Sequence, residues 1–133
     1  MNIPFVSDFA FWDYPSLISI NILSGVSYFG LYAFGLFTGL TSLVIPSAVT
    51  IINAYTFYGC TGLPSINIPS GITFIGDYAF SGYTSLTRIK ISLNDALIGE
   101  EAFSTSLSSI NITASVSSIG MKTFIGDKIS HVS

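Results

Sequence analysis

The sequence predicts a mainly β solenoid, in which short coils stack on one another and parallel strands run rung on rung. Three observations predict this fold class. A dipeptide of a small residue and phenylalanine recurs with a 23-residue period, aliphatic residues recur in the same register, and only 8% of the residues are charged. A repeat of this length cannot bury an apolar face alone, so successive repeats must stack to form one continuous core.

The dipeptide marks the same position in every repeat. Its copies are Ala10-Phe11, Ala33-Phe34, Thr56-Phe57, Ala79-Phe80, Ala102-Phe103 and Thr123-Phe124, with a last step that is shorter than the others. Two turn residues are missing before that last copy, because Phe80 and Leu86 are six positions apart whereas Phe103 and Leu107 are four apart. We expect a short 3₁₀ or helical turn at each Ala-Phe position.

Aliphatic columns define two extended segments in each repeat. In the first segment, Leu-x-x-Ile-x-Ile, the two isoleucines share one side of a strand because side chains alternate with a period of two. Its columns are Leu17, Leu40, Leu63, Leu86, Leu107; Ile20, Leu43, Ile66, Ile89, Ile110; and Ile22, Ile45, Ile68, Ile91, Ile112. The second, shorter segment carries Val26, Val49, Ile72, Val116, and then Phe29, Ile52, Ile75, Ile98, Ile119. Parallel strands would join these columns at about 4.8 Å per coil.

The repeats fill the chain as a single domain of residues 1–133, which is the number of domains expected for this length. The predicted units are residues 17–39, 40–62, 63–85, 86–106 and 107–128, with partial units at about 1–16 and 129–133.

The unit 63–85 resembles the BspA-type leucine-rich repeat. That repeat has the same length, an Ile-Pro pair after the strand, and an Ile-Gly-x-x-Ala-Phe turn, which here are Ile68-Pro69 and the segment 75–80. The resemblance covers nearly the whole chain and implies a right-handed leucine-rich-repeat solenoid of about five to six coils. The cysteine of the family's turn is matched only by Cys60, and other coils carry Tyr14, Phe37 and Tyr83 there.

The resemblance also carries expectations about function. It implies a non-enzymatic role, and members of the family are found largely as surface or secreted proteins of bacteria and protists, associated with adherence and protein–protein contact. We therefore expect an extracellular or cell-surface location, although residues 1–10 lack the basic start of a signal peptide.

Composition excludes several other classes of function. Four Lys+Arg against seven Asp+Glu cannot form a basic surface for nucleic acid. One cysteine and one histidine, His131, leave no set of residues for a catalytic site or a metal site, so we predict no enzyme, no metal and no cofactor. The apolar window 28–45 approaches the length of a membrane span, but glycine and hydroxyl residues interrupt it, and we predict no span.

Both ends of the repeat array lack a polar capping unit. Ile3, Val6 and Phe11 fit the apolar columns at one end, as do Ile129 and Val132 at the other. Open solenoid ends expose strand edges and a bare apolar layer, so we expect head-to-tail contact between copies of the chain, which gives a filament where the contact does not close. The alternative is a fragment, or a monomer with frayed ends.

Two outer apolar columns could add lateral contact. End stacking of one coil falls short of the total of about 1,000 Å² that a specific interface needs. The outer columns are Phe9, Tyr32, Tyr55, Tyr78 and Tyr28, Ile51, Phe74, Leu97, and the predicted lateral interface is Tyr28, Tyr32, Ile51, Tyr55, Phe74 and Tyr78. Alternatively these side chains lie flat and complete the local packing.

The outward positions of the first segment are mostly small and neutral. On this predicted concave face lie Ser42, Ser65, Asn67, Arg88, Lys90 and Asn111. A partner here would be recognised by hydrogen bonds more than by charge, or the face is simply solvated. We also expect an ion pair between Glu101 of the fourth unit and Lys122, which lies one rung further on in the same column. Within the fourth unit we expect Leu93 to point inward while Asp95 bulges into solvent.

Two functions follow from these features. The first is a structural protein that self-associates end to end into a filament or larger assembly, so that its partners are other copies of itself. The second is a cell-surface adhesin or binding module that holds a host or matrix protein, or a glycan, on the concave face.

Overall fold

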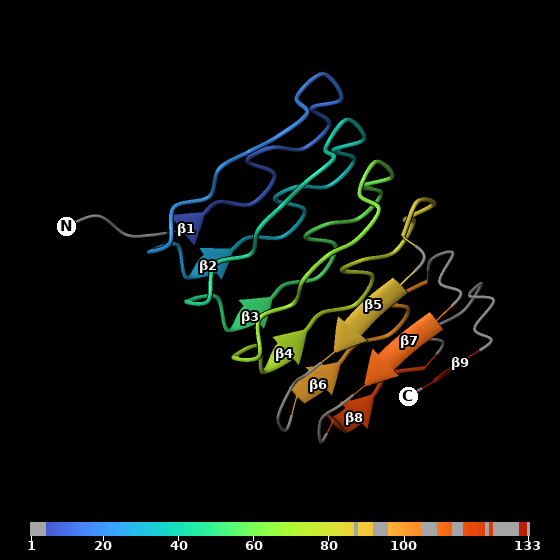
Figure 1. Ribbon diagram of the computed structural model, residues 1–133. Helices are drawn as coiled ribbons and strands as arrows, with labels where there is room; N and C mark the ends of the chain where they lie inside the picture. Colours follow the sequence, from blue (N-terminus) through green and yellow to red (C-terminus); the bar gives the residue numbers. More distant parts are fainter. Residues whose placement is uncertain are drawn as a thin grey trace.

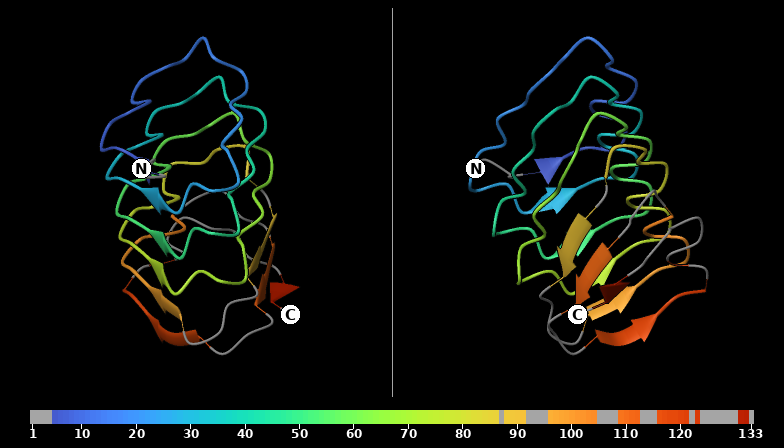
Figure 2. Two further views of the ribbon diagram at one scale, coloured as in Figure 1. Left: turned by 90° about the vertical axis from the view of Figure 1, so that its left-hand side faces the viewer. Right: turned by 45° about the vertical axis from the view of Figure 1, so that its right-hand side comes forward.

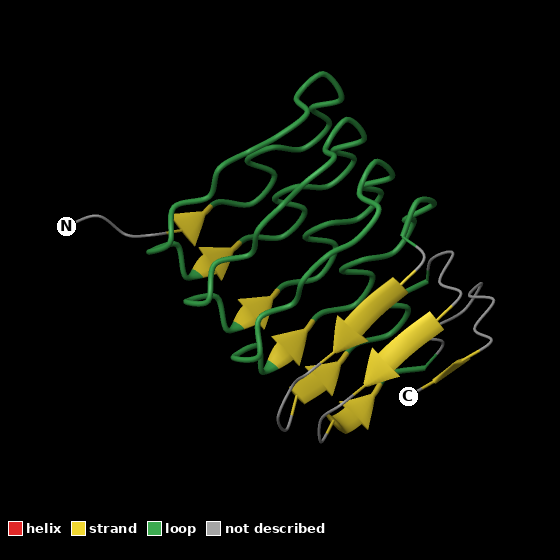
Figure 3. Ribbon diagram, in the orientation of Figure 1, coloured by secondary structure: helices red, strands yellow, loops and turns green. Residues whose placement is uncertain are grey.

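The computed structural model describes residues 5–86, 88–91, 96–104, 109–112, 116–121, 123 and 131–132. Within them the chain climbs coil by coil as a solenoid (Figure 1), and no helix occurs in this part of the chain (Figure 3). The predicted mainly β solenoid is thereby confirmed.

Two parallel sheets lie on opposite sides of the coils (Figure 2). The larger sheet has the order β1-β2-β3-β4-β6-β8 and comes from the second extended segment of each repeat. Its strands are β1 (Phe5–Val6), β2 (Tyr28–Phe29), β3 (Ile51–Ile52), β4 (Phe74–Ile75), β6 (Ala96–Ile98) and β8 (Val116–Ile119). The smaller sheet has the order β5-β7-β9, with β5 (Arg88–Ile91), β7 (Ser109–Ile112) and β9 (His131–Val132).

The strand register follows the predicted columns. In the larger sheet Phe29 pairs with Ile52, Ile52 with Ile75, Ile75 with Ile98, and Ile98 with Ile119. The first extended segment forms regular strands only in the later coils, and the pair Ser19 and Ser42 is an isolated bridge. Pro46 and Pro69 directly follow this segment in two coils, where they supply no N–H to a ladder.

One register shift falls between Ala96 and Leu97. Ala96 is fully buried and pairs with Val116, so it fills the column in which the spacing of the repeats had placed residue 95. Leu93 and Asp95, for which an inward and an outward position were predicted, lie outside the described residues, as does Lys122.

The Ala-Phe segment is a turn, but the expectation that it is 3₁₀ or helical was wrong for the described coils. The residue before the small residue has a φ of 55° at Tyr32, 59° at Tyr55 and 57° at Tyr78. A right-handed helix needs negative φ at every residue, so this position interrupts it. Two tight turns result instead: the Ala33 N–H donates to the Gly30 oxygen (3.3 Å), and the Gly35 N–H donates to the Tyr32 oxygen (3.0 Å).

The turns of successive coils are themselves hydrogen-bonded to one another. The N–H of Phe34 donates to the Thr56 oxygen (2.8 Å), that of Phe57 to the Ala79 oxygen (2.9 Å), and that of Phe80 to the Ala102 oxygen (2.8 Å). Each coil is therefore bonded to the next on the turn side as well as in the strands. All of these N–H groups point toward the later coil, and the accepting carbonyls point toward the earlier one.

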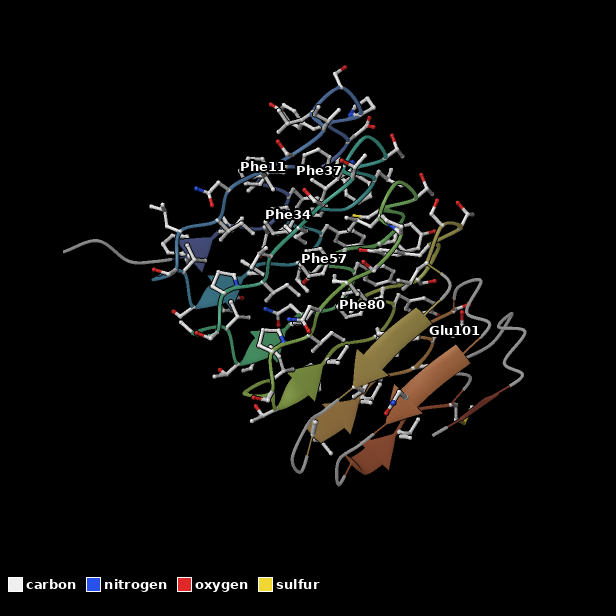
Figure 4. The ribbon with its side chains drawn as sticks, viewed as in Figure 1. Phe11, Phe34, Phe37, Phe57, Phe80 and Glu101 are labelled. Atoms are coloured by element: carbon white, nitrogen blue, oxygen red, sulfur yellow. The ribbon has the colours of Figure 1, made fainter. Side chains whose placement is uncertain are left out.

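An inner phenylalanine stack, made of Phe11, Phe34, Phe57, Phe80 and Phe103, runs through the core beside these turns. Its first four members are labelled in Figure 4. Neighbouring ring centroids are 5.4, 5.3, 5.4 and 5.2 Å apart along this series, with the rings within 11° of parallel. The four rings after Phe11 are fully buried, and each buried ring is worth about 1.5–3 kcal/mol. The stack therefore adds to the stability of every interior coil.

Threonine replaces alanine in two copies of the dipeptide without leaving a buried polar group unpaired. The Thr56 hydroxyl donates to the Asn53 oxygen (2.8 Å), and the Thr123 hydroxyl donates to the Gly120 oxygen (2.7 Å). Both acceptors are carbonyls of the residue that begins the turn, so either small residue fits there.

Replacing Gly76 by alanine should destabilise the fold. A Cβ at Gly76 would lie 2.5 Å from the Ala54 nitrogen and 2.8 Å from the Asn53 carbonyl carbon of the preceding coil. Because backbone atoms cannot move aside, we expect Gly76→Ala to lower the free energy of unfolding by about 1–3 kcal/mol in urea denaturation. Gly25→Ala is the matched control, since nothing lies within 4 Å of its Cβ. Equal stabilities of the two variants would contradict close coil packing.

Candidate interaction surfaces

An outer ring ladder, made of Phe9, Tyr32, Tyr55 and Tyr78, runs along the outside of the turns. The ring centroids of Phe9 and Tyr32 are 5.0 Å apart, those of Tyr32 and Tyr55 are 4.5 Å apart, and those of Tyr55 and Tyr78 are 4.9 Å apart. Interplanar angles between 8° and 11° make it a face-to-face stack. The rings cover one another's faces, so their edges face the solvent.

The backbone holds this ladder in an unusual conformation. Every ring in it is attached at the positive-φ position of the turn, where a residue other than glycine costs of order 1–3 kcal/mol. Ring stacking contributes about 0.5–1.5 kcal/mol per pair beyond area burial. Stacking between coils therefore offsets part of the backbone strain, which explains why aromatic residues occur where glycine would fit more easily.

Charge and burial shift the pKa of two hydroxyls in the ladder. Glu101 stands next in this column, and its negative charge is the main cause that raises the pKa of Tyr78. Partial burial is the main cause that raises the pKa of Tyr55, and electrostatic interaction with the neighbouring Tyr32 and Tyr78 hydroxyls raises it further. Tyr55 and Tyr78 are therefore neutral phenols at physiological pH.

Two aromatic residues that the column analysis did not single out support the ladder from the side. Trp12 packs edge-on against Phe9 (5.8 Å, 76°) and Tyr32 (5.1 Å, 82°), and Tyr58 packs edge-on against Tyr55 (5.7 Å, 67°). Gly35 separates Trp12 and Tyr58 in their common column, and the Trp12 ring lies against it. Because the column mixes aromatic residues with glycine, the repeat pattern gave no signal for them.

The second outer column, Tyr28, Ile51, Phe74 and Leu97, lies on the larger sheet. These side chains are 44%, 40%, 37% and 47% exposed. Phe5 extends the column by pairing with Tyr28, and it is 49% exposed. Phe5 was not among the predicted lateral residues, although it lies one repeat before Tyr28 in the same column. The result is an exposed apolar stripe that crosses five strands.

The first coil ends in an apolar layer that no described residue covers. Leu17 is 40% exposed whereas Leu40, one coil further on, is fully buried. Val6 and Phe11 are likewise half-buried, although the next residues in their columns are fully buried. We call this surface the first-coil end layer, and its members are Val6, Phe11, Leu17, Ile20, Ile22 and Val26. Of the predicted end-to-end contact residues, Ile3 and Ile129 lie outside the described residues, while Val132 lies in β9.

The residues of the predicted concave face lie along the first extended segments of successive repeats. Ser42, Ser65 and Asn67 are exposed, and Asn111 is half-buried. Arg88 and Lys90 pair with Ser109 and Asn111 in the parallel sheet. Val44, also on this face, is 77% exposed. The face therefore offers short hydroxyl and amide side chains around an exposed valine.

Cys60 is buried in the core beside Tyr83 and has no feature of a reactive thiol. It donates to the Phe34 carbonyl oxygen at 3.0 Å. Burial raises the pKa of Cys60 to about 12, and hydrogen bonds to Tyr83 and to the Phe37 backbone lessen that rise. Burial likewise raises the pKa of Tyr83. Since thiolate is the nucleophilic form, Cys60 is inert in the folded chain.

The burial of Cys60 makes the stability depend on pH in the alkaline range. An unfolded thiol ionises near pH 9 and the folded one only near 12, so above pH 9 the unfolded chain has released a proton that the folded chain still holds. The contribution of the Cys60 thiol to the free energy of unfolding should therefore be fully present below pH 9. It should be lost as the pH rises toward 12, by up to about 1.4 kcal/mol per pH unit. Cys60→Ala should fall less steeply in urea titrations. Identical slopes for the two chains would contradict the buried thiol.

Among the described residues, no group of three or more His, Cys, Asp or Glu side chains could hold a metal ion. The same part of the chain contains no apolar helix of membrane-spanning length.

Comparison with known proteins identifies the repeat. The model of the BspA type leucine rich repeat region, in six copies, matches residues 4–131. A leucine-rich repeat protein from Bacteroides ovatus is similar in structure, with 33% identity and a TM-score of 0.64 over 66% of this chain and 23% of that one. A leucine rich cell surface protein from Faecalibacterium prausnitzii has 27% identity and a TM-score of 0.64 over 95% of this chain and 43% of its own. The chain thus spans less than half the length of either. No curated protein matches it.

Proposed function

Because the chain belongs to the BspA-type leucine-rich repeat family, we propose that it is a non-enzymatic cell-surface protein that stacks end to end with further copies of itself into a filament or larger assembly. The family is generally non-enzymatic and serves protein interaction, and one structural neighbour is described as a cell surface protein. The observation that carries the proposal is the first-coil end layer. Exposed apolar layers of this kind mark interaction sites in soluble proteins.

A coil of a second copy fits that layer better than an unrelated surface does. Within the chain, equivalent residues stack like on like, as Phe11 does on Phe34 at 5.4 Å. A coil of another copy offers the same columns at the same spacing. The contact would be heterologous, because one end of the array meets the opposite end of the next copy, and such contacts give open filaments where they do not close.

Hydrogen bonding on the turn side supports the same arrangement. The carbonyls of Leu31, Ala33 and Gly35 point toward the first coil and accept from the N–H groups of Phe9, Phe11 and Asp13 at 2.9, 2.8 and 3.0 Å. The equivalent carbonyls of the first coil, those of Asp8, Ala10 and Trp12, therefore face away from the array. They form a row of acceptors that a further coil would satisfy with its N–H groups. Among the described strands, β1 likewise has a neighbour on one side only.

The outer columns would strengthen the contact laterally. One coil end is small compared with the total of about 1,000 Å² that specific interfaces bury. The exposed side chains of Tyr28, Ile51 and Phe74 lie along the solenoid on the larger sheet. They would form the contact between two filaments that pack side by side. Tyr32, Tyr55 and Tyr78 add polar tips on an apolar body, which suits an interface.

The substitution Leu17→Asp should weaken assembly. It places a charge in the first-coil end layer at a side chain that is 40% exposed, so the fold should tolerate it. Loss of about 1.5–3 kcal/mol of apolar burial predicts association weaker by about tenfold or more. Sedimentation velocity over a concentration series, with electron microscopy of the same samples, measures the effect.

The matched control is Val44→Asp, which adds the same charge at a 77% exposed valine on the concave face and should leave assembly unchanged. A parent chain that stays monomeric at every concentration would end the proposal. So would a Leu17→Asp chain that assembles as well as the parent.

The second candidate function is that of an adhesin or a module that binds a protein or a glycan. It is favoured by the exposed Ser42, Ser65 and Asn67 on one face, where leucine-rich repeats commonly hold partners. Such a partner would be held by hydrogen bonds.

The double variant Ser42→Glu and Ser65→Glu tests this candidate. Capture of a matrix protein or of glycans on an array should be lost, because two carboxylates block the hydroxyl positions, while the sedimentation profile should not change. The single variant Ser47→Glu is the control, since Ser47 is also exposed but lies past Pro46. Capture that survives the double variant would exclude this face.

A further inference from the structure

We propose that the outer ring ladder is a site of oxidative cross-linking, at which a haem peroxidase using hydrogen peroxide couples Tyr55 to a stacked neighbour, Tyr32 in preference to Tyr78. The bond would join adjacent coils covalently. It would form within one chain, and so does not depend on assembly.

The geometry of the stack brings the reacting atoms together. Tyr32 and Tyr55 have ring centroids 4.5 Å apart and planes 11° from parallel, so the two rings lie face to face. Both rings are attached at the same position of the repeat, with φ values of 55° and 59°, so in a parallel stack the carbon atoms beside one hydroxyl should face those beside the other. These ring carbons carry much of the unpaired electron density of a phenoxyl radical. Tyr78 stacks on the other face of Tyr55 at 4.9 Å and 8°.

The stacked series holds three tyrosines, and neither residue at its ends is a phenol. Phe9 stacks beyond Tyr32 at 5.0 Å, but it has no hydroxyl and cannot form a phenoxyl radical. Glu101 occupies the next position beyond Tyr78 in the column. A carboxylate cannot form a phenoxyl radical, so the series of stacked tyrosines ends at Tyr78.

The reaction balances as follows. The peroxidase removes one electron from each of two tyrosines, and each phenol loses its hydroxyl proton. The two phenoxyl radicals form one C–C bond between the ring carbons beside their hydroxyls. Each of these carbons then loses its proton, and each oxygen regains one, so that both rings are aromatic phenols again. The pair has lost two hydrogen atoms in total, and one hydrogen peroxide is reduced to two waters.

The test treats the dilute full chain with peroxidase and hydrogen peroxide. We expect dityrosine fluorescence in the monomer, a mass lower by two hydrogen atoms, and a cross-linked peptide pair that contains Tyr32 and Tyr55. Tyr55→Phe should abolish the cross-link. Tyr55 belongs to both stacked tyrosine pairs, and this substitution keeps its ring but removes its hydroxyl. Tyr58→Phe is the matched control: Tyr58 meets Tyr55 edge-on, and its loss should leave the yield unchanged.

Three results would overturn the proposal. They are an undiminished yield in Tyr55→Phe, products dominated by Tyr14, Tyr28 or Tyr58, and an equal yield from the urea-unfolded chain. Repeating the reaction in Leu17→Asp separates this proposal from self-association. A cross-link that still forms in Leu17→Asp does not require end stacking. If the parent chain forms no cross-link, the cross-linking proposal is wrong, whereas the end-stacking proposal is unaffected.

Discussion

Hydrogen bonds between the backbones of successive coils are the interaction on which the rest of the structure depends. They act on the strand side, where the Gly76 N–H donates to the Ile52 oxygen at 2.8 Å, and on the turn side, where the Phe57 N–H donates to the Ala79 oxygen at 2.9 Å. Both sets run in register, so residues of one coil lie beside their equivalents in the next. The inner phenylalanine stack, the outer ring ladder and the first-coil end layer all follow from that constraint.

The same constraint imposes costs that local chemistry offsets. Glycine at positions 76, 99 and 120 lets backbones approach where a side chain would collide. Aromatic residues at the positive-φ position gain stacking in return for backbone strain. A coil with a described neighbour on only one side makes half of these contacts, and for this reason Leu17 of the first described coil is 40% exposed whereas Leu40 is fully buried.

Periodicity predicted the stacking and the register, because burial selects the same residue type at each turn of the coil. It did not predict the conformation of the turn. The Ala-Phe spacing suits a helix, and only the positive φ at Tyr32 and its equivalents excludes one. It also did not predict the ring contacts of Trp12 and Tyr58, because their column changes residue type between coils. The pairing of Ala96 with Val116 was not predicted either, because the strand register shifts between Ala96 and Leu97. The exposed outer columns were predicted residue by residue, but the periodicity of one chain carries no information on what contacts them.

Nuclear Overhauser contacts between ring protons of the buried phenylalanines test the central claim most directly. In-register stacking predicts strong contacts from Phe57 to Phe34 and to Phe80, whose ring centroids lie 5.3 and 5.4 Å away, and none between Phe34 and Phe80, which Phe57 separates. Contacts between residues three or four apart, in place of those one repeat apart, would contradict the stacked coil.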